Sequence, residues 1–274
     1  MSFDPAAVRA FEHAGWERAA GAYDATFAQA SRQFVEPLLD AAAVGPAQPV
    51  LDLCCGTGVA TAAAARRGSS AVGLDFSAAM LAAARRANPK LRFDEGEVEA
   101  LPYENGAFAA VIANFGMHHA PEPARAAAEA YRVVQPGGRF AFTTWAAPSE
   151  NIAWRLLFDA IRAHGDPDAA KAPPSGGNLA TAAAVSDLLR RAGFREPQIK
   201  LLRREWVVAE PQQLVAALAR GTVRTAAQIA AQSEAARPAI LHTLAAAAAP
   251  YRRADGTFAV PIAAILGCGA KPAR

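Results

Sequence analysis

The segment VLDLCCGTG, residues 50–58, places an aspartate and two glycines directly after an apolar run. The run is typical of a buried strand that ends near Asp52, and a helix is expected to begin a few residues later. Gly56 and Gly58 would let the backbone approach a ligand closely, and the start of the helix offers free backbone N–H groups. The pattern indicates a nucleotide-like ligand, although a glycine-rich strand-to-helix turn without a ligand fits it too.

A second acidic residue follows at a spacing that favours nucleotide binding. Asp75 comes 23 residues after Asp52, at the end of a second predicted strand. A carboxylate at this place can accept hydrogen bonds from both hydroxyls of a ribose. Its alternative role is to cap the next helix, for which Ser77 is better suited. Phe76 is compatible with stacking on a purine and equally with packing in the core.

Polar side chains also end the third predicted strand, in the segment GEVEALPY at residues 96–103. Glu97 can accept a hydrogen bond from an adenine amino group, and the Val98 backbone can contact the neighbouring ring nitrogen. Taken alone, the same glutamate is compatible with a solvated loop.

The fourth predicted strand ends in NFGMHHAPEP, residues 114–123. Asn114 is expected to border the ligand. His118 and His119 leave the strand at the same place, and histidine titrates near neutral pH, which suits a general base. One of the two is expected instead to hold the loop through a hydrogen bond.

These segments belong to a regular alternation of strands and helices. The predicted strands lie at residues 49–55, 70–75, 90–96, 107–116, 137–145, 197–208 and 256–270. Helices are predicted between most of them, and two more, at 4–20 and 24–43, precede the first strand. Such an alternation predicts a mostly parallel sheet covered by helices on both faces, with ligands beyond the carboxyl ends of the strands.

The composition of the chain limits the kinds of partner that we expect it to bind. The 274 residues include 53% hydrophobic and 19% charged residues, and the net charge of +3 reflects 28 basic and 25 acidic side chains. This balance predicts no nucleic-acid partner. Three cysteines without a C-x-x-C pair predict neither a disulfide framework nor a bound metal. No run reaches the ~18 apolar residues of a membrane span, and the N-terminal segment lacks a signal-peptide core, so we expect a cytoplasmic protein.

Four segments in order resemble the class I S-adenosylmethionine-dependent methyltransferases: VLDLCCGTG, GLDFS, EGEVEALPYENGAFAAVIANFGMHH and AYRVVQPGGRFAFTTW. They are most similar to the branch related to the ubiquinone and menaquinone biosynthesis methyltransferases, over roughly residues 20 to 145. The GWERAAGAYD segment before them and the VPIAAILGCGAKP segment near the end are also similar to small-molecule methyltransferases of this kind.

The resemblance implies an α/β fold with a Rossmann-like, seven-stranded, mostly parallel doubly wound sheet. N-terminal helices and a helical insertion between the last two strands would complete it. We expect an N-terminal helical cap at residues 1–46 and an S-adenosylmethionine-binding core at 47–146. The remainder of the same domain, 147–274, would carry substrate-covering insertions at 147–180 and 209–255.

The resemblance also implies S-adenosylmethionine as the cofactor and S-adenosylhomocysteine as its product. Asp52 and the loop Cys54–Gly58 would hold the methionine moiety, Asp75 the ribose, and Phe76 with Met80 the adenine. Two residues depart from the commoner pattern: Cys54 stands where many relatives have glycine, and Glu97 where aspartate is commoner. The residues expected to bind the cofactor are Tyr23, Asp52, Cys54, Gly56, Gly58, Asp75, Phe76, Met80, Glu97, Val98 and Asn114.

Methyl transfer from a sulfonium requires alignment in a dry pocket, and a base only when the nucleophile arrives protonated. His118 and His119 are the predicted catalytic residues. Sugar methyltransferases resembling this branch can pair such a histidine with an acid after the fifth strand, but Thr143 and Thr144 stand there, so no orienting carboxylate is expected. The acceptor is expected to be a small, partly apolar molecule methylated on oxygen or carbon. Its predicted wall consists of Trp16, Trp145 and Trp154.

Three alternatives remain open at this point. The chain is compatible with a non-catalytic module that binds S-adenosylmethionine or another metabolite. A nicotinamide-dependent oxidoreductase shares the glycine turn and the acid after the second strand, but the segment lacks G-x-G-x-x-G. The vicinal thiols of Cys54 and Cys55 are compatible with a soft metal, although they lie inside the predicted cofactor loop. A homodimer is also compatible with the sequence.

Overall fold

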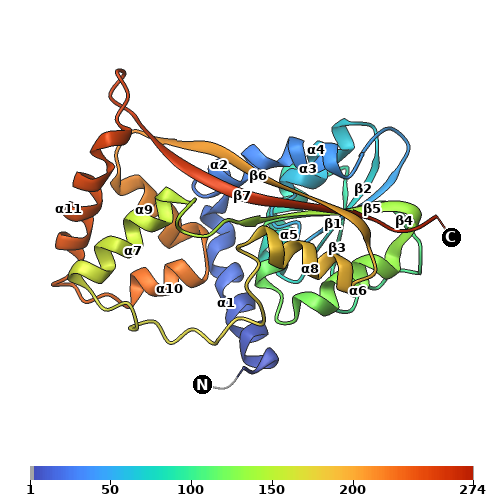
Figure 1. Cartoon of the computed structure of the whole chain (residues 1–274), viewed down its shortest axis with the longest axis horizontal. Coiled ribbons are helices and arrows are strands. Elements are labelled where there is room, and N and C mark those ends of the chain that lie inside the picture. The colour runs from blue at the N-terminus through green and yellow to red at the C-terminus, as the bar shows by residue number, and fades with distance from the viewer. Residues whose placement is uncertain (1–2, 274) are drawn as a thin grey trace.

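A seven-stranded sheet forms the centre of the molecule, as a computed structural model that describes residues 3–273 shows. The strand order is β3-β2-β1-β4-β5-β7-β6 (Figure 1). Neighbours from β3 to β5 are parallel, whereas β7 is antiparallel to both β5 and β6. The predicted mostly parallel fold is therefore confirmed. The strands are β1 (Pro49–Leu53), β2 (Ser70–Asp75), β3 (Arg92–Glu95), β4 (Phe108–Asn114), β5 (Val134–Trp145), β6 (Arg195–Val208) and β7 (Phe258–Ala270).

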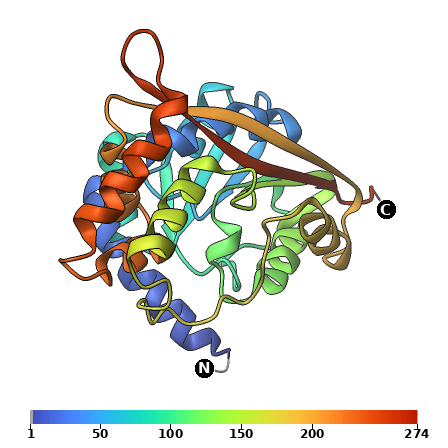
Figure 2. The same cartoon turned by 60° about the vertical axis from the view of Figure 1, so that its left-hand side comes forward.

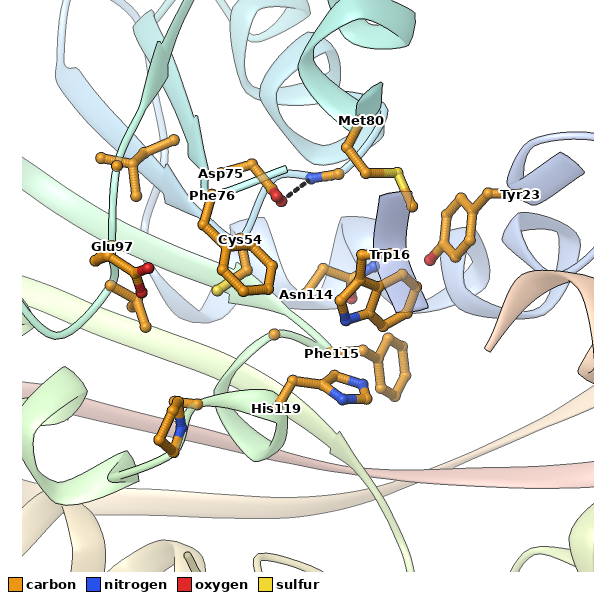
Figure 3. A pocket seen from close by; sticks show the side chains of 17 residues that line it. Trp16, Tyr23, Cys54, Asp75, Phe76, Met80, Glu97, Asn114, Phe115 and His119 are labelled. Atoms are coloured by element: carbon orange, nitrogen blue, oxygen red, sulfur yellow. Dashed lines mark hydrogen bonds between the residues drawn. The ribbon is translucent and has the colours of Figure 1, made fainter. Parts of the chain in front are cut away.

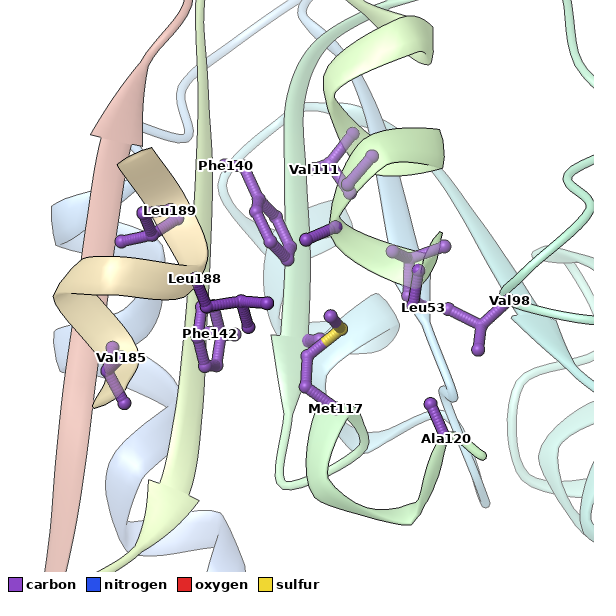
Figure 4. Packing of buried hydrophobic residues seen from close by; sticks show 14 of the residues in the cluster. Leu53, Val98, Val111, Met117, Ala120, Phe140, Phe142, Val185, Leu188 and Leu189 are labelled. Atoms are coloured by element: carbon purple, nitrogen blue, oxygen red, sulfur yellow. The ribbon is translucent and has the colours of Figure 1, made fainter. Parts of the chain in front are cut away.

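Helices cover both faces of the sheet because successive side chains of a strand point to opposite sides. Val50 of β1 packs in a cluster with α3 and α4, whereas Leu51 and Leu53 pack in a cluster with α6 and α8. Figure 4 shows the second cluster, in which Phe140 and Phe142 of β5 meet leucines of α8. The helices concerned are α3 (Val35–Ala41), α4 (Val59–Arg66), α6 (Pro123–Val133) and α8 (Ala182–Arg191).

The helix after β2 begins where the sequence predicts it. Ser77 precedes α5 (Ala78–Ala87), and its Oγ accepts a hydrogen bond from the Met80 backbone N–H at 3.1 Å. Such a cap satisfies one of the free N–H groups of the first helical turn. The carboxyl end of β2 is thereby fixed next to the start of a helix.

The N-terminal region differs from the prediction in one respect. The long α1 (Pro5–Tyr23) is present, but the helix predicted over 24–43 is broken into α2 (Ala28–Ser31), the 3₁₀ turn η1 (Arg32–Phe34) and α3. The breaks let Phe27 and Phe34, both buried, turn into the interior, where each meets Trp145 edge-on or tilted. A continuous helix would have left one of these rings without its partners.

A helical insertion lies at one end of the molecule (Figure 1). It consists of α9 (Gln212–Gly221), α10 (Arg224–Ala230), α11 (Arg237–Ala248) and the short turn η3 (Ala249–Tyr251), between β6 and β7, and it packs with α7 (Ile152–His164). Figure 2 shows the long β6–β7 ribbon that joins this insertion to the rest of the sheet. Helix α1 contacts both α5 of the core and α9 of the insertion, so it bridges the two ends.

Candidate active site

A cavity lies at the carboxyl ends of β1, β2 and β4, beneath α1 (Figure 3). The space between its walls, open solvent at the mouth included, is about 670 Å³. Except for Asp52 and Gly58, every residue predicted to bind the cofactor lines it. The lining residues are Trp16, Tyr23, Cys54, Gly56, Leu74, Asp75, Phe76, Met80, Gly96, Glu97, Val98, Asn114, Phe115, Gly116, His119, Ala120 and Pro121.

The glycine-rich loop after β1 turns its backbone toward this cavity. Gly56 has a φ of +55°, and a Cβ built on it would meet no atom within 4 Å, so open space lies against the backbone here. Gly58 has a different role, because a Cβ on it would lie 2.8 Å from the Phe93 ring. Gly58 is therefore required for packing against β3, whereas Gly56 faces the space for a ligand.

Cys54 adopts the left-handed conformation, with a φ of +53°. Its side chain occupies the space beside Gly116, where a Cβ would lie 2.9 Å from the Cys54 Sγ and closer still to the Cys54 Cβ. Real Cβ atoms do not approach so closely. The glycine at position 116 therefore makes room for the cysteine that departs from the commoner sequence pattern.

Asp75 ends β2 inside the cavity and fixes the glycine loop. One carboxylate oxygen accepts the Gly56 backbone N–H at 2.8 Å, and the other accepts that of Ser77 at 2.9 Å. Burial raises the pKa of Asp75 to about 6, although these backbone donors oppose the rise. Each oxygen retains a lone pair, so the carboxylate can also accept hydrogen bonds from a ligand.

Asp52 lies behind the loop rather than on the cavity wall. One carboxylate oxygen accepts the Thr61 hydroxyl of α4 at 2.6 Å, and the other has no partner among residues 3–273. Burial raises the pKa of Asp52 to about 7. The structure thus brings Asp52 to the base of the loop, where it ties the end of β1 to α4.

The end of the cavity that lies after strands β2 and β3 is lined by Phe76, Glu97 and Val98. The Phe76 ring meets the edge of His13 with centroids 5.3 Å apart. Arg9 of α1 reaches the same end: its Nε lies 3.4 Å from Glu97, and another of its nitrogens donates to Glu99 at 2.9 Å. Sequence reasoning missed Arg9, which lies on a predicted helix without a local motif.

Helix α1 forms the cover of the cavity. Both Trp16 and Tyr23 line the cavity (Figure 3). Their rings meet edge-on, with 6.0 Å between the centroids. The Tyr23 hydroxyl lies 3.2 Å from the Ser31 hydroxyl. Glu17 fastens the helix to the core, because its carboxylate accepts hydrogen bonds from the Ser77 hydroxyl and the Ala79 backbone N–H.

The two histidines occupy different environments in the turn η2 (Met117–His119). His119 lines the cavity, whereas His118 does not. The His118 Nδ1 lies 3.4 Å from the Thr144 hydroxyl of β5, and burial together with the neighbouring His119 lowers the pKa of His118 well below its usual value. His118 is therefore neutral and holds the turn against the sheet, while His119 faces the ligand space.

A carboxylate does orient His119, contrary to the expectation from the sequence. The His119 Nδ1 lies 2.9 Å from Oε2 of Glu12, a residue of α1 with no exposed side-chain area. The other Glu12 oxygen accepts the Arg224 Nε at 2.7 Å. No acid stands at the end of β5, where Thr143 and Thr144 lie, and the fold supplies one from the cover helix instead. The sequence does contain a signal for a buried acid at this position, because Glu12 has the helical spacing of the buried residues Val8, Gly15 and Ala19 of α1.

The other two predicted tryptophans do not reach the cavity wall. Trp145 stacks on Phe115, with centroids 3.9 Å apart and planes inclined by 17°. Trp154 lies 4.7 Å from Trp145, and its indole N–H donates to Thr225 at 3.3 Å. Phe115 lines the cavity and these rings support it from behind. Trp16 is the tryptophan that the structure brings to the ligand space.

Within residues 3–273, no group of three or more His, Cys, Asp or Glu side chains is arranged to hold a metal ion. Cys54 and Cys55 diverge, since Cys54 lines the cavity and Cys55 packs with Leu81 and Phe93. In the same described part of the chain, no helix has both the length and the apolar character that crossing a membrane requires.

The segment 50–138, which contains β1 to β4 and the glycine loop, matches the family described as "Methyltransferase domain". This segment is therefore similar to a methyltransferase domain, in agreement with the resemblance deduced from the sequence. The curated relatives include demethylmenaquinone methyltransferases. The chain is 36% identical over 119 residues to the demethylmenaquinone methyltransferase of Renibacterium salmoninarum, covering 43% of this chain and 50% of that protein. The enzyme of the same name from Beutenbergia cavernae is 37% identical over 110 residues, 40% of this chain and 46% of that one.

This chain spans about half the length of the curated relatives it matches. Solved structures cover more of it. The YcgJ protein of Bacillus subtilis has a TM-score of 0.57 at 17% identity, over 88% of this chain and 98% of that one. The Haemonchus contortus phosphoethanolamine N-methyltransferase 2 has a TM-score of 0.53 at 15% identity, over 88% and 52% of the two chains. At these identities the likeness establishes the fold alone.

Proposed function

We propose that this protein transfers a methyl group from S-adenosylmethionine to a small-molecule acceptor. The observation that carries the proposal is the cavity at the carboxyl ends of β1, β2 and β4, where open space at Gly56 meets the carboxylate of Asp75. The matched methyltransferase domain contains both residues. A structure of similar fold, the Haemonchus contortus enzyme, is a complex with S-adenosyl-L-methionine, which supports the choice of cofactor.

The cavity residues fit this cofactor. The backbone at Gly56 would receive the methionine end, since an anion is favoured where free N–H groups meet the start of a helix. Asp75 would accept hydrogen bonds from the ribose hydroxyls with its remaining lone pairs. Phe76 and Met80 supply apolar surface for the adenine, and Glu97 offers an acceptor for its amino group. The bound cofactor would supply a methyl group activated by a positively charged sulfur.

The protein's own contribution is alignment, exclusion of water and removal of a proton. Trp16 and Tyr23 of α1 close the cavity from above, which shields the reacting atoms from water. Phe115 presents an apolar wall, which favours a small, partly apolar acceptor. Methylation on its oxygen or carbon is part of the proposal. His119 is the cavity residue able to accept a proton from such an acceptor.

Isothermal titration with S-adenosylmethionine and S-adenosylhomocysteine tests the cofactor. We expect both to bind the wild type, and Asp75→Ala to weaken binding by about 1–3 kcal/mol, the scale of hydrogen bonds to a charged group. Asp187→Ala, which removes an exposed carboxylate from α8, is the matched control and should bind as the wild type does. Absence of binding to the wild type would refute the proposal, and equal affinity of Asp75→Ala would refute the ribose assignment.

Turnover is tested separately by mass spectrometry of S-adenosylhomocysteine formed with a panel of small phenols, hydroquinones, enols and sugars. Product formation above the rate without acceptor supports methyl transfer. A protein that binds the cofactor but methylates no member of a broad panel would instead be a binding module.

A further inference from the structure

We propose that Glu12 is a positioning residue for His119. Its carboxylate, carried by the cover helix α1, fixes the imidazole so that Nε2 is the atom that takes a proton from the methyl acceptor. This inference rests on the proposed methyl transfer and adds to it the group that orients the base. Neither Glu12 nor its partner Arg224 lies in the matched segment 50–138.

The hydrogen-bond geometry assigns the tautomer of His119. An ionised carboxylate can only accept hydrogen bonds, and Oε2 of Glu12 lies 2.9 Å from the His119 Nδ1. The proton of the neutral ring must therefore be on Nδ1, which leaves the lone pair on Nε2. No hydrogen bond joins Nε2 to another residue in the described chain, and the ring lines the cavity.

Glu12 is held in this position from a third element. Its Oε1 accepts the Arg224 Nε of α10 at 2.7 Å, and Arg224 also donates to the Pro173 carbonyl at 2.7 Å in the segment between α7 and α8. Helix α1, the insertion and that segment thus meet at one buried carboxylate. An ion pair with a fixed partner on each oxygen leaves Glu12 little freedom to rotate.

The hydrogen bonds from His119 and Arg224, together with the Arg224 charge, keep Glu12 ionised. Burial by itself would raise the pKa of Glu12, but His119 and Arg224 together hold it below its ordinary value. The other groups that face the His119 ring are His118 of the same turn, at 4.1 Å between centroids, and the edge of Trp16 at 4.9 Å. A fixed negative charge at Nδ1 stabilises the imidazolium that forms when Nε2 takes a proton.

In the step that follows, the hydroxyl proton of the acceptor moves to Nε2 of His119. The freed electron pair of the acceptor oxygen forms the new bond to the methyl carbon, and the electrons of the broken carbon–sulfur bond remain on sulfur. The products are the methyl ether, neutral S-adenosylhomocysteine and an imidazolium whose Nδ1–H still donates to Glu12. Release of that proton to water restores the base.

The tautomer can be measured without turnover. Nitrogen-15 NMR of histidine-labelled wild-type protein, saturated with S-adenosylhomocysteine at a pH where the ring is neutral, is expected to show His119 protonated on Nδ1. A ring protonated on Nε2, or a rapidly exchanging mixture, would overturn the proposal. If the wild type methylates nothing in the acceptor panel, the proposed function fails, but this measurement still decides the role of Glu12.

Kinetic measurements on two variants of α1 distinguish orientation of the His119 ring from attachment of the helix to the core. Glu12→Gln should lower kcat by about 10- to 100-fold with the KM for S-adenosylmethionine within about twofold. Each rate is measured with a phenol or hydroquinone that the wild type methylates.

Glu17→Gln is the matched control, since Glu17 also fastens α1 to the core but bonds Ser77 and not the histidine. It should leave the tautomer of His119 unchanged, even where it lowers the melting temperature. Equal effects of the two variants, or a change in melting temperature alone for Glu12→Gln, would show that Glu12 is merely structural. If Glu12→Gln does not fold, the wild-type NMR measurement decides by itself.

Discussion

The close approach of Cys54 and Gly116 makes a sharp prediction about the cavity floor. In Gly116→Ala the new Cβ would lie 2.9 Å from the Cys54 Sγ and closer to its Cβ, so the loop or the turn must shift. Overpacking of this kind costs about 1–3 kcal/mol. Gly116 has a φ of −90°, which alanine adopts without strain, so a gain of about 0.4–1 kcal/mol from the unfolded state offsets part of the cost. We expect a net loss of about 1–2 kcal/mol in the free energy of unfolding.

Cys54→Gly removes both clashing atoms and relieves a left-handed residue of its Cβ. That relief, about 1–2 kcal/mol, is balanced by the greater freedom of glycine in the unfolded chain and by lost packing. The single variant should therefore be close to neutral, and the double variant should recover the loss caused by Gly116→Ala. Their coupling energy is expected to be about 1–3 kcal/mol.

Urea unfolding of the four proteins, followed by circular dichroism at one pH, measures this cycle. Cys55→Ala combined with Gly116→Ala is the matched control, because the Cys55 side chain points to Leu81 and Phe93 instead. The control cycle should be additive. If the Cys54 cycle is also additive within about 0.5 kcal/mol, the glycine at 116 is not there to accommodate the cysteine, and the explanation is wrong.

Three further predictions concern the acids, the loop and the histidines. Because the pKa of Asp52 is raised from 3.8 to about 7, the folded state binds this proton more tightly than the unfolded state, and this group lowers stability by up to about 4 kcal/mol as pH rises from 4 to 8. Asp75, whose pKa is raised to about 6, adds to the fall, so urea unfolding of Asp52→Asn should show a smaller fall than the wild type. An equal slope in both proteins would contradict the assignment. Gly56→Ala places a methyl group in the ligand space, so calorimetry should detect no cofactor binding. The melting temperature should drop only slightly, because strain at a φ of +55° costs about 1–2 kcal/mol. Tight binding by this variant would exclude the loop as the methionine site. His119→Ala should lower kcat far more than it lowers cofactor affinity. His118 lies outside the cavity, so His118→Ala should mainly lower thermal stability. A larger loss of kcat in His118→Ala than in His119→Ala would reverse the two roles.

The sequence predicted the sheet, and it predicted which residues meet at the carboxyl ends of the strands, because their signals are local. Strand periodicity, the glycine loop and the acid after β2 each lie within a few residues, and parallel pairing brings the carboxyl ends of the strands to one edge. Asp75 therefore lines the cavity as expected. Its two candidate roles prove to be compatible, since it accepts the Ser77 N–H and still has lone pairs for a ligand.

The acceptor side could not be predicted in the same way. The partners of Glu12 lie 107 and 212 residues away, and no spacing rule connects them. Aromatic residues at helical or strand spacing do not reveal whether they form a wall or the layer behind it. Trp145 and Trp154 belong to that layer because Phe115 lies between them and the cavity, a fact fixed by the packing of α7 and β5.

Helix α1 has a larger part in this site than its lack of motifs suggests. Three charged residues on it contact three different places around the cavity: Arg9 reaches Glu97, Glu17 reaches the Ser77 cap of α5, and Glu12 reaches His119. One helix thus both covers the cavity and carries the carboxylate that contacts the His119 ring. Most of the residues that line the cavity lie within residues 50–138, but Glu12 and Arg224, which hold the His119 ring, lie outside that segment. Relatives that share the segment and differ in α1 or in α10 are therefore expected to keep the cofactor and to change the acceptor chemistry.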